Sequence, residues 1–582
     1  MNTTATASEG AIFRRVILAG LMLGLLASEG LAQTPPTAGD EDTLGVPAQA
    51  SETVDVEIVA DDAANGGLTA AQELALEAEA AMRDEAIAAQ AAARQQPRAV
   101  IPRPAQVMTV TSVTVGQSAY LSDAQISAAT AATLGRQVNV QQAAQLASAF
   151  NAAYAENGIE IASAVVSEID PRTGAVSIRL NEPRIGQVRV ADGALATGDV
   201  YARRLALSEG ALADSREIER RQLRLQRLSG VVTQMAVTPG SAADTVDLNF
   251  TLLEPPLRTT SLTLDNHGNS STGRERAILS FSHASLTGNL DPLSVSLTLA
   301  RGLRSASLGY ARPVTADGMT MFGSASLERS RSITGPDVTG RTMTLEMGVS
   351  VPIVVERDRQ ITLRASAQHF REIRRVFGVA TTDQRGEALT FGANFARFWD
   401  RSSLGYDQTV RLLTWRDSAL GRQRTALLAG EGSGGIMLGA DWRVSGRLGW
   451  QAVIGQNAPA SFRVGLTSPT RVRGYDPSVS SGDAFVFGSV QFQRVTPWTV
   501  MESASHPVSL FPFAFFDAGR AFDRNGGTTV SQDTVLSAGL GTVVQIGQRM
   551  VGELVVAMPL RDANGVNAAG RVRLDVRMGV RF

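Results

Sequence analysis

Length, composition and charge set the first limits on this protein. The chain has 582 residues, and because a single apolar core rarely grows beyond about 250–300 residues, two or three modules are expected. It contains no Cys and only four scattered His, which excludes a disulfide framework and a thiol nucleophile and argues against a metal site. All 54 basic residues are Arg, so a P-loop lysine and a Schiff-base lysine are excluded. A net charge of −2 and a mean hydropathy of zero predict neither a nucleic-acid partner nor a helical membrane protein.

The N-terminus has the pattern of a signal peptide. Arg14 and Arg15 precede an apolar run at 16–27, and small residues around Ala32 suit a signal peptidase, so residues 1–32 are predicted to be removed. A membrane anchor is the alternative, but the run is shorter than the roughly 20 residues that a spanning helix needs. Residues 33–68 are rich in Pro, Ala, Asp and Glu and are predicted to be a flexible linker. Because no other apolar run approaches this length, any membrane crossing by the mature chain must use strands.

Residues 69–95 are predicted to form a helix that is polar on nearly every side. Thr69 and Gln72 fit a capping box, strong helix formers continue to Gln95, and Pro97 ends the pattern. Such a helix cannot sit in an apolar core, so it is expected either in solvent or inside a polar enclosure. Residues 96–106 are predicted to be a second linker.

Residues 107–183 and 184–256 are predicted to be two α+β modules with the same order of elements. Each reads as strand, helix, helix, strand, strand. The elements expected in the first are strand 110–115, helices 122–135 and 140–157, and strands 161–169 and 175–180. In the second they are strand 185–190, helices 200–207 and 215–228, and strands 231–238 and 245–252. Two unrelated small domains are the alternative.

Residues 257–582 alternate between apolar and polar residues with turn residues between the runs. This period is typical of a soluble sandwich and also of an outer-membrane barrel, whose apolar face meets lipid. The signal peptide and the last twelve residues favour the barrel, because the apolar positions from Val572 to Phe582 alternate with four Arg, an Asp and a Gly. At roughly twenty residues per strand and connection, about sixteen antiparallel strands are expected.

Two short motifs lie near the end of this region. Val472-Arg473-Gly474-Tyr475 occurs in a turn-rich stretch between strands expected around 462–466 and 484–493. About forty residues later, strand parity places Phe515, Asp517 and Gly519 on one face. Since a carboxylate is costly on a lipid face, Asp517 is expected to point into the lumen, where Arg473 is a suitable partner.

These motifs resemble the paired signature of the two-partner secretion transporters (TpsB), relatives of the barrel-assembly insertases. Leu264–Gly268 and the terminal Phe582 are similar to the first barrel strand and the barrel-assembly signal of that family. The resemblance implies that both modules are periplasmic POTRA domains and that helix 69–95 plugs the pore. It also implies an inward-loop motif (Val472, Arg473, Gly474, Tyr475) whose Arg473 contacts Asp517 of a lumen partner motif (Phe515, Asp517, Gly519). The long acidic segment before the helix departs from the family pattern, and a mobile periplasmic spacer is the alternative for the helix.

The function that the resemblance implies is export of one large exoprotein across the outer membrane of a Gram-negative bacterium, without ATP. Its partners would be the secretion domain of that substrate, outer-membrane lipid and, during biogenesis, the barrel-assembly machinery. An insertase for other membrane proteins and a passive porin are the alternatives. No catalytic spacing of Ser, His and Asp is found, so no enzyme, cofactor or metal is expected.

Overall fold

The computed structural model describes residues 107–477, 479–501, 507–525, 528–563, 565–566 and 568–582. They fall into two compact units, and the chain divides between Pro255 and Pro256. The predicted signal peptide, linkers and polar helix lie outside the described residues. Among the described helices, none has the length and apolar character needed to cross a membrane.

The first module folds around a three-stranded sheet in the order β2-β5-β4, in which β2 and β5 are parallel. Its elements are β1 (Val107–Thr109), β2 (Ser112–Val115), α3 (Asp123–Thr133), β3 (Gln137–Asn139), a 3₁₀ helix (Val140–Ala147), α4 (Ser148–Glu156), β4 (Ser163–Asp170) and β5 (Ala175–Asn181). Buried Leu146, Phe150 and Tyr154 lie at its centre. The α-helix predicted at 140–157 is therefore wrong in its first half, where the chain forms a tighter 3₁₀ helix. The pairing of β1 with β3 was not predicted.

The second module repeats this topology, with β6 and β8 parallel in a sheet of order β6-β8-β7. Its elements are β6 (Arg184–Val190), α5 (Gly198–Leu205), α6 (Ser215–Ser229), β7 (Val232–Pro239) and β8 (Thr245–Leu253). Helix α6 is capped at its start by Asp214, whose side chain accepts a hydrogen bond from the Arg216 amide, and at its end by left-handed Gly230. The Ser215 hydroxyl accepts the backbone amide of Glu160 at 2.9 Å, which links the two modules.

A Glu-Pro pair ends each module and performs the same structural task in both. The Glu182 carboxylate accepts the Tyr154 hydroxyl at 2.7 Å and the Ala119 amide at 2.8 Å. In the second module the Glu254 carboxylate accepts the hydroxyl of Tyr201 and the Ala194 amide. Burial, reinforced by the hydrogen bond to glutamate, raises the pKa of both tyrosines, so both phenols remain protonated donors at neutral pH. These shared contacts support a common fold for the two modules.

Glu182→Ala is expected to destabilise the first module by about 1–3 kcal/mol, because it leaves the buried Tyr154 hydroxyl without its acceptor. Urea unfolding of a fragment spanning residues 107–255, followed by circular dichroism, measures the loss. Glu168→Ala, at an exposed position of β4, is the control. Equal unfolding midpoints for the two variants would contradict the prediction.

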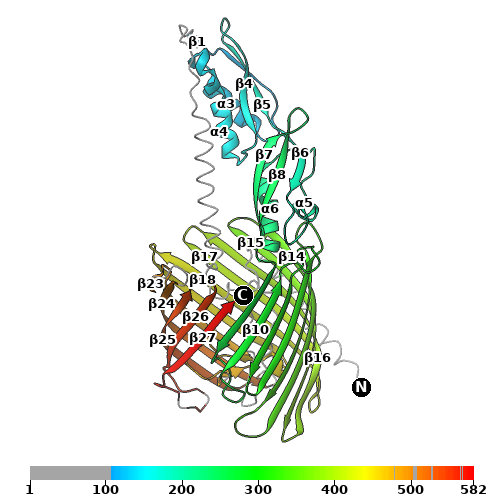
Figure 1. The fold of residues 1–582 in the computed structure, drawn as a ribbon, viewed down its shortest axis with the longest axis vertical. Helices are drawn as coiled ribbons and strands as arrows, with labels where there is room; N and C mark the ends of the chain where they lie inside the picture. The colour runs from blue at the N-terminus through cyan, green and yellow to red at the C-terminus, as the bar shows by residue number, and fades with distance from the viewer. Residues whose placement is uncertain (1–106, 478, 502–506, 526–527, 564, 567) are drawn as a thin grey trace, which may run out of the picture. The chain divides into compact units, whose positions relative to one another are not determined.

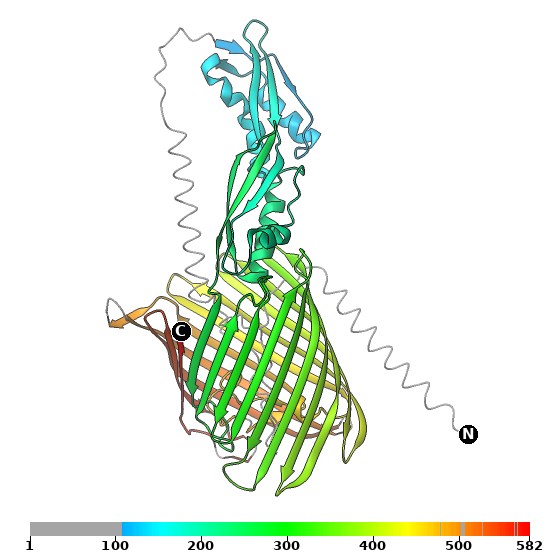
Figure 2. The ribbon, with the colours of Figure 1, turned by 45° about the vertical axis from the view of Figure 1, so that its right-hand side comes forward.

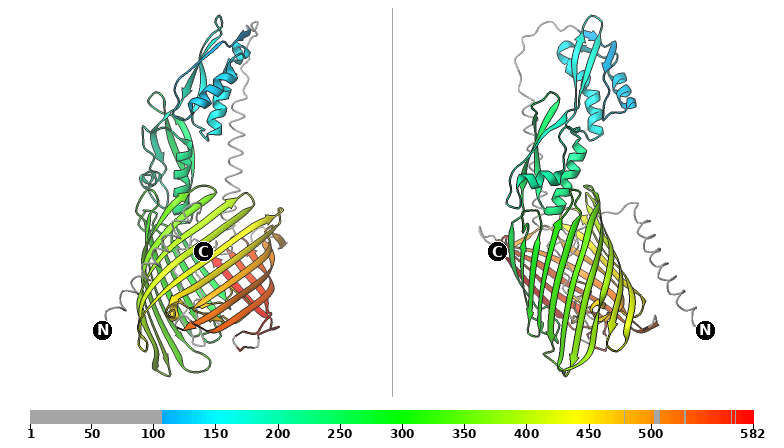
Figure 3. Two further views of the ribbon diagram at one scale, coloured as in Figure 1. Left: turned by 180° about the vertical axis from the view of Figure 1, so that it is seen from behind. Right: turned by 90° about the vertical axis from the view of Figure 1, so that its right-hand side faces the viewer.

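The second unit is a closed antiparallel barrel of sixteen strands (Figure 1). Its strands are β9 (Arg258–Asp265), β10 (Arg276–His283), β11 (Leu293–Ala300), β12 (Leu303–Pro313), β13 (Thr320–Arg331), β14 (Val338–Val355), β15 (Arg359–Val376), β16 (Val379–Trp399), β17 (Ser402–Asp417), β18 (Gly421–Leu438), β19 (Trp442–Gly455), β22 (Ala484–Arg494), β23 (Trp498–Met501), β24 (Val508–Asn525), β25 (Thr528–Ile546), β26 (Met550–Pro559) and β27 (Arg573–Arg581). Both β22 and β23 pair with β24 and count as one interrupted strand. The strands tilt steeply against the barrel axis (Figure 2). The later strands, coloured yellow to red, form the part of the barrel wall that Figure 3 shows from behind.

Cross-strand register assigns one face of every strand to the lumen. Asp517 lies opposite Ser489 and Ser537, and the same parity continues around the barrel to Asp265 on β9. On the other face the apolar residues are exposed, as expected for a surface that meets lipid: Leu297, Leu299, Met343, Leu345 and Met347 are among them. The assignment of the apolar face to lipid is therefore confirmed.

The lumen is less polar than the sequence suggested. Phe370, Trp415 and Phe462 belong to an apolar cluster inside the barrel, and Leu466 and Phe487 belong to a second one. Both clusters include residues of the segment between β19 and β22, so they mark where that segment packs against the wall. The barrel strand expected at 462–466 is wrong: the chain forms a 3₁₀ turn (Ala460–Phe462) and the two-residue β20 (Val464–Gly465).

Candidate functional site

The candidate site is the loop between Gly455 and Ala484, which folds back into the barrel. Within it β20 pairs with β21 (Ser481–Gly482), forming a small hairpin whose far end carries the Val472–Tyr475 motif. Val472 has no exposed surface and packs in the cluster with Leu466 and Phe487. The loop therefore contributes to an apolar cluster that also contains wall residues, and this cluster holds the loop against the wall.

Arg473 and Asp517 meet inside the barrel. Arg473 Nε lies 2.8 Å from Asp517 Oδ2 and Nη2 lies 2.8 Å from Oδ1, a bidentate pair. The Arg473 backbone amide also donates to Oδ2 at 3.1 Å. Two further guanidinium hydrogens reach Gln491 Oε1 at 3.0 Å and Ser489 Oγ at 3.2 Å. Asp517 has no exposed surface, so its charge is both buried and fully paired.

Neighbouring side chains on the wall shape this contact. Ser489 lies directly opposite Asp517 in the sheet and donates to Oδ1 at 2.6 Å. The Arg473 guanidinium carbon lies 3.5 Å from the centre of the Phe515 ring, a cation–π contact. Gly519 is needed because a Cβ there would approach Leu466 of the loop within 2.7 Å. The three residues of the lumen partner motif therefore supply the acceptor, the aromatic surface and the space that the loop requires.

Gly474 and Tyr475 fix the tip of the loop against the part of the wall formed by β25 and β26, next to β24. Gly474 has a φ of 90°, and a Cβ on it would meet Ala557 Cβ at 3.0 Å. The Tyr475 hydroxyl lies 2.8 Å from the carbonyls of both Leu536 and Arg561, which share its single hydrogen, and it accepts the Leu536 amide at 3.2 Å. All four residues of the inward-loop motif thus lie at the interface between the loop and the wall.

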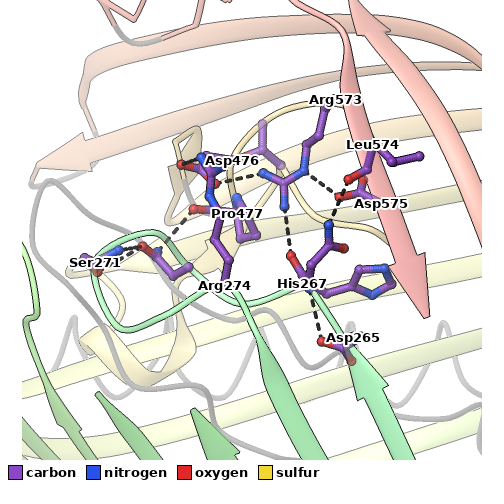
Figure 4. A network of polar contacts seen from close by, with 12 residues as sticks. Asp265, His267, Ser271, Arg274, Asp476, Pro477, Arg573, Leu574 and Asp575 are labelled. Carbon is purple, nitrogen blue, oxygen red and sulfur yellow. Dashed lines mark hydrogen bonds and ion pairs between the residues drawn. The ribbon is translucent and has the colours of Figure 1, made fainter. Parts of the chain in front are cut away.

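Asp476 extends the loop to the junction where the last strand closes on the first. Its carboxylate lies 2.8 Å from Arg573 on β27 and 3.1 Å from Arg274 in the β9–β10 turn. Figure 4 shows the Arg573 guanidinium between Asp476 and Asp575, with the Asp575 contact at 2.6 Å. One carboxylate of the loop therefore holds both sides of the junction.

The junction itself has a short register. Five residue pairs, from Arg577↔Asp265 to Arg581↔Ser261, join β27 to β9, whereas β9 and β10 share eight. Side chains extend it: Asn266 donates to the Leu574 carbonyl and accepts the Val576 amide, both at 2.8 Å. These contacts and Asp476 supplement a pairing that is weak in backbone hydrogen bonds.

Arg471 is a buried residue that the sequence analysis missed. It is 2% exposed, donates to the Gly465 carbonyl at 3.1 Å, and its guanidinium lies 5.5 Å from the Phe485 ring. Its place in a Thr-Arg-Val-Arg run gave no sign that the two arginines differ. Arg471 therefore joins the β20 backbone to the aromatic rings of β22, while Arg473 pairs with Asp517 on β24.

Phe582 lies away from this loop. Its backbone amide donates to the Thr260 carbonyl at 2.8 Å, and its side chain is 70% exposed at the end of β27. That exposure leaves the ring accessible at the edge of the barrel. Its role as an assembly signal stays a prediction.

Sequence comparison assigns the chain to a family. A POTRA domain model of ShlB type matches residues 108–182, and the model of the haemolysin secretion/activation protein ShlB/FhaC/HecB matches residues 247–544, half of the chain. The chain belongs to this family. Its barrel is accordingly placed in the outer membrane and its POTRA region in the periplasm.

Two curated relatives match part of the chain. It is 28% identical over 181 residues to the outer membrane transporter CdiB of Escherichia coli, covering 30% of each chain. It is 25% identical over 185 residues to the heme/hemopexin transporter protein HuxB of Haemophilus influenzae (strain 86-028NP), covering 31% of this chain and 32% of HuxB. The matched segment therefore spans about a third of these relatives. The solved structure of CdiB from Escherichia coli has a TM-score of 0.65 over 84% of this chain and 93% of that one at 17% identity, which supports the fold.

Asp476→Asn is expected to loosen the junction between β9 and β27, because it weakens two charge-assisted hydrogen bonds worth about 1.5–3 kcal/mol each. The chain has no Cys, so spin labels on introduced Leu264→Cys and Met578→Cys, which face each other across the junction, report its width. A broader distance distribution is expected.

Glu356→Gln is the control, since Glu356 pairs with Arg359 at the turn between β14 and β15, several strands away from the junction. Identical distance distributions in the two variants would show that Asp476 does not hold the strands together.

Proposed function

We propose that this protein is an outer-membrane transporter that exports one large protein substrate in the manner of two-partner secretion. The observation that carries the proposal is the inward loop, locked by the buried Arg473–Asp517 pair within a closed barrel. A passive porin has no need of a loop core, a bidentate buried pair and POTRA modules. The names of the two curated relatives, both transporters, agree with this proposal.

Substrate capture would use the outer strands of the POTRA sheets. The first sheet has β2 and β4 at its edges, and the second has β6 and β7. Along β7 most side chains are exposed, and within the part of the chain that the structure describes β7 pairs with β8 alone. An extended substrate segment can add to such an edge by backbone hydrogen bonds, which suits recognition of an unfolded chain in the periplasm.

Translocation would proceed through the lumen without a nucleotide. The sequence contains no lysine for a P-loop, and the periplasm has no supply of ATP, so folding of the substrate outside the cell is the proposed driving force. Because the loop occupies the lumen, it and any plug must shift before a chain can pass. The charged contacts of Arg473 and Asp476 give the loop a defined resting position from which to move.

Arg473→Ala is expected to reduce secretion by about tenfold or more, because it removes a buried ionic partner and leaves Asp517 uncompensated. Substrate in the culture medium is measured by immunoblot, and heat-modifiable migration of the barrel measures insertion, which should be unchanged. Arg401→Ala, in an exposed turn, is the control. Normal secretion in the Arg473→Ala strain would refute the role assigned to the pair.

The insertase alternative is separated from export by a deletion strain. Quantitative proteomics of the medium and the outer membrane should show loss of one large secreted protein and an unchanged set of barrel proteins. Depletion of many barrel proteins from the membrane would instead establish an insertase.

A further inference from the structure

Seven arginines form a continuous band on the outside of the barrel, one on each of seven adjacent strands. We call this set the arginine ladder. Its members, in order from β12 to β18, are Arg304, Arg329, Arg341, Arg371, Arg385, Arg416 and Arg422. All seven are exposed, and their parity places them on the face opposite the lumen.

The first three members are directly opposed in the sheet. Arg304 lies across from Arg329, and Arg329 lies across from Arg341. Directly opposed like charges destabilise a sheet. Three arginines opposed in this way therefore lower the stability of the sheet, and the fold itself does not explain why they are there.

The other four members form a second run. Arg371 lies across from Arg385, which lies across from Arg416, and Arg416 lies across from Arg422. The two runs are offset by only two residues, since Arg341 faces Ile373. The ladder thus crosses seven strands almost without a break.

Few carboxylates neutralise this charge. Among the described residues, Arg371 pairs with Asp383 at 3.6 Å, and the other six members make no ion pair. Glu387, on the same face, lies 3.9 Å from His369. Arg375 and Arg424 add further positive charge to this end of the strands, whereas Arg331 pairs with Asp337 at 3.2 Å. The surface is therefore strongly cationic and suited to an anionic partner.

The ladder borders the apolar band that faces lipid. Four leucines lie on the same face as the ladder, each four residues along the strand from one of its members: Leu308, Leu345, Leu389 and Leu412. At about 3.3 Å per residue, four residues span about 13 Å of strand, which places the guanidinium groups at the level of lipid headgroups. The chain enters β9 from the periplasmic modules, so the start of β12 and the end of β13 lie at the outer leaflet.

We propose that the arginine ladder binds the phosphate groups of phosphorylated glycolipid, the lipid A type, in the outer leaflet. Guanidinium groups bind phosphate oxygens bidentately, and adjacent strands about 4.8 Å apart present several of them to one headgroup. On the other side of the barrel the outer end of β24 carries one exposed arginine, Arg520, and the outer ends of β26 and β27 carry exposed Met558 and Leu574 on the corresponding face. Glycolipid would thus hold β12–β18 in the leaflet and leave the side of the closing junction without such a contact.

Retention of glycolipid by the full-length chain tests the proposal directly. The protein is placed in phosphatidylcholine nanodiscs and titrated with bisphosphorylated lipid A or with the same lipid after enzymatic dephosphorylation, and bound lipid is counted by native mass spectrometry. The phosphorylated form should bind at a concentration about tenfold lower, and high salt should reduce the difference. Equal binding of the two lipids overturns the proposal, as does equal binding of phosphatidylglycerol.

Variants locate the surface. The triple variant Arg304→Gln, Arg341→Gln and Arg385→Gln should weaken binding of phosphorylated lipid A about tenfold. The control variant changes three exposed arginines at the periplasmic end of the barrel, namely Arg312→Gln, Arg357→Gln and Arg549→Gln, and should leave binding unchanged. Equal effects of the two triple variants overturn the assignment to the ladder. If the ladder variant does not insert into the membrane, the comparison of phosphorylated and dephosphorylated lipid A on the unaltered protein still tests the proposal.

Discussion

The bidentate contact between Arg473 and Asp517 is the interaction on which the arrangement of the lumen depends. A buried carboxylate is tolerated only when its charge is paired and its oxygens are hydrogen-bonded, and Asp517 obtains this from the guanidinium, the Arg473 amide and the Ser489 hydroxyl. Because the partner lies on a loop rather than on a strand, satisfying Asp517 requires that the loop fold inward. The apolar clusters around Leu466 and Phe462 then add burial to the same placement.

The loop also connects parts of the chain that are far apart in sequence. Tyr475 reaches carbonyls of Leu536 and Arg561, and Asp476 reaches arginines at both chain ends of the barrel. Since β9 and β27 share a short register, the closing junction relies on side chains more than its neighbours do. A shift of the loop would therefore break salt bridges at the junction, and in the proposed transport these contacts would link the loop in the lumen to the barrel wall.

Charge is used differently in the three regions. In each of the two α+β modules a single glutamate satisfies a buried tyrosine and a backbone amide, which ties the last strand to the loop that precedes a helix. In the lumen, arginines are paired with carboxylates at close range. On the outside of β12–β18 the arginines face one another instead. An anion from the membrane would neutralise their charge, as we propose.

The sequence by itself determined the faces of the strands, the two α+β modules and the pairing of Arg473 with Asp517, because alternation has a period of two and the motifs resemble a known family. It did not determine register, since a shift of two residues preserves the faces while changing every opposite neighbour. Only the tertiary structure therefore decided that the arginines align into a ladder, that Asp476 bridges the closing junction, and that Arg471 and Arg473 have different partners. The 3₁₀ turn at 140–147 likewise depended on its surroundings, because helix-forming residues alone do not distinguish the two helices.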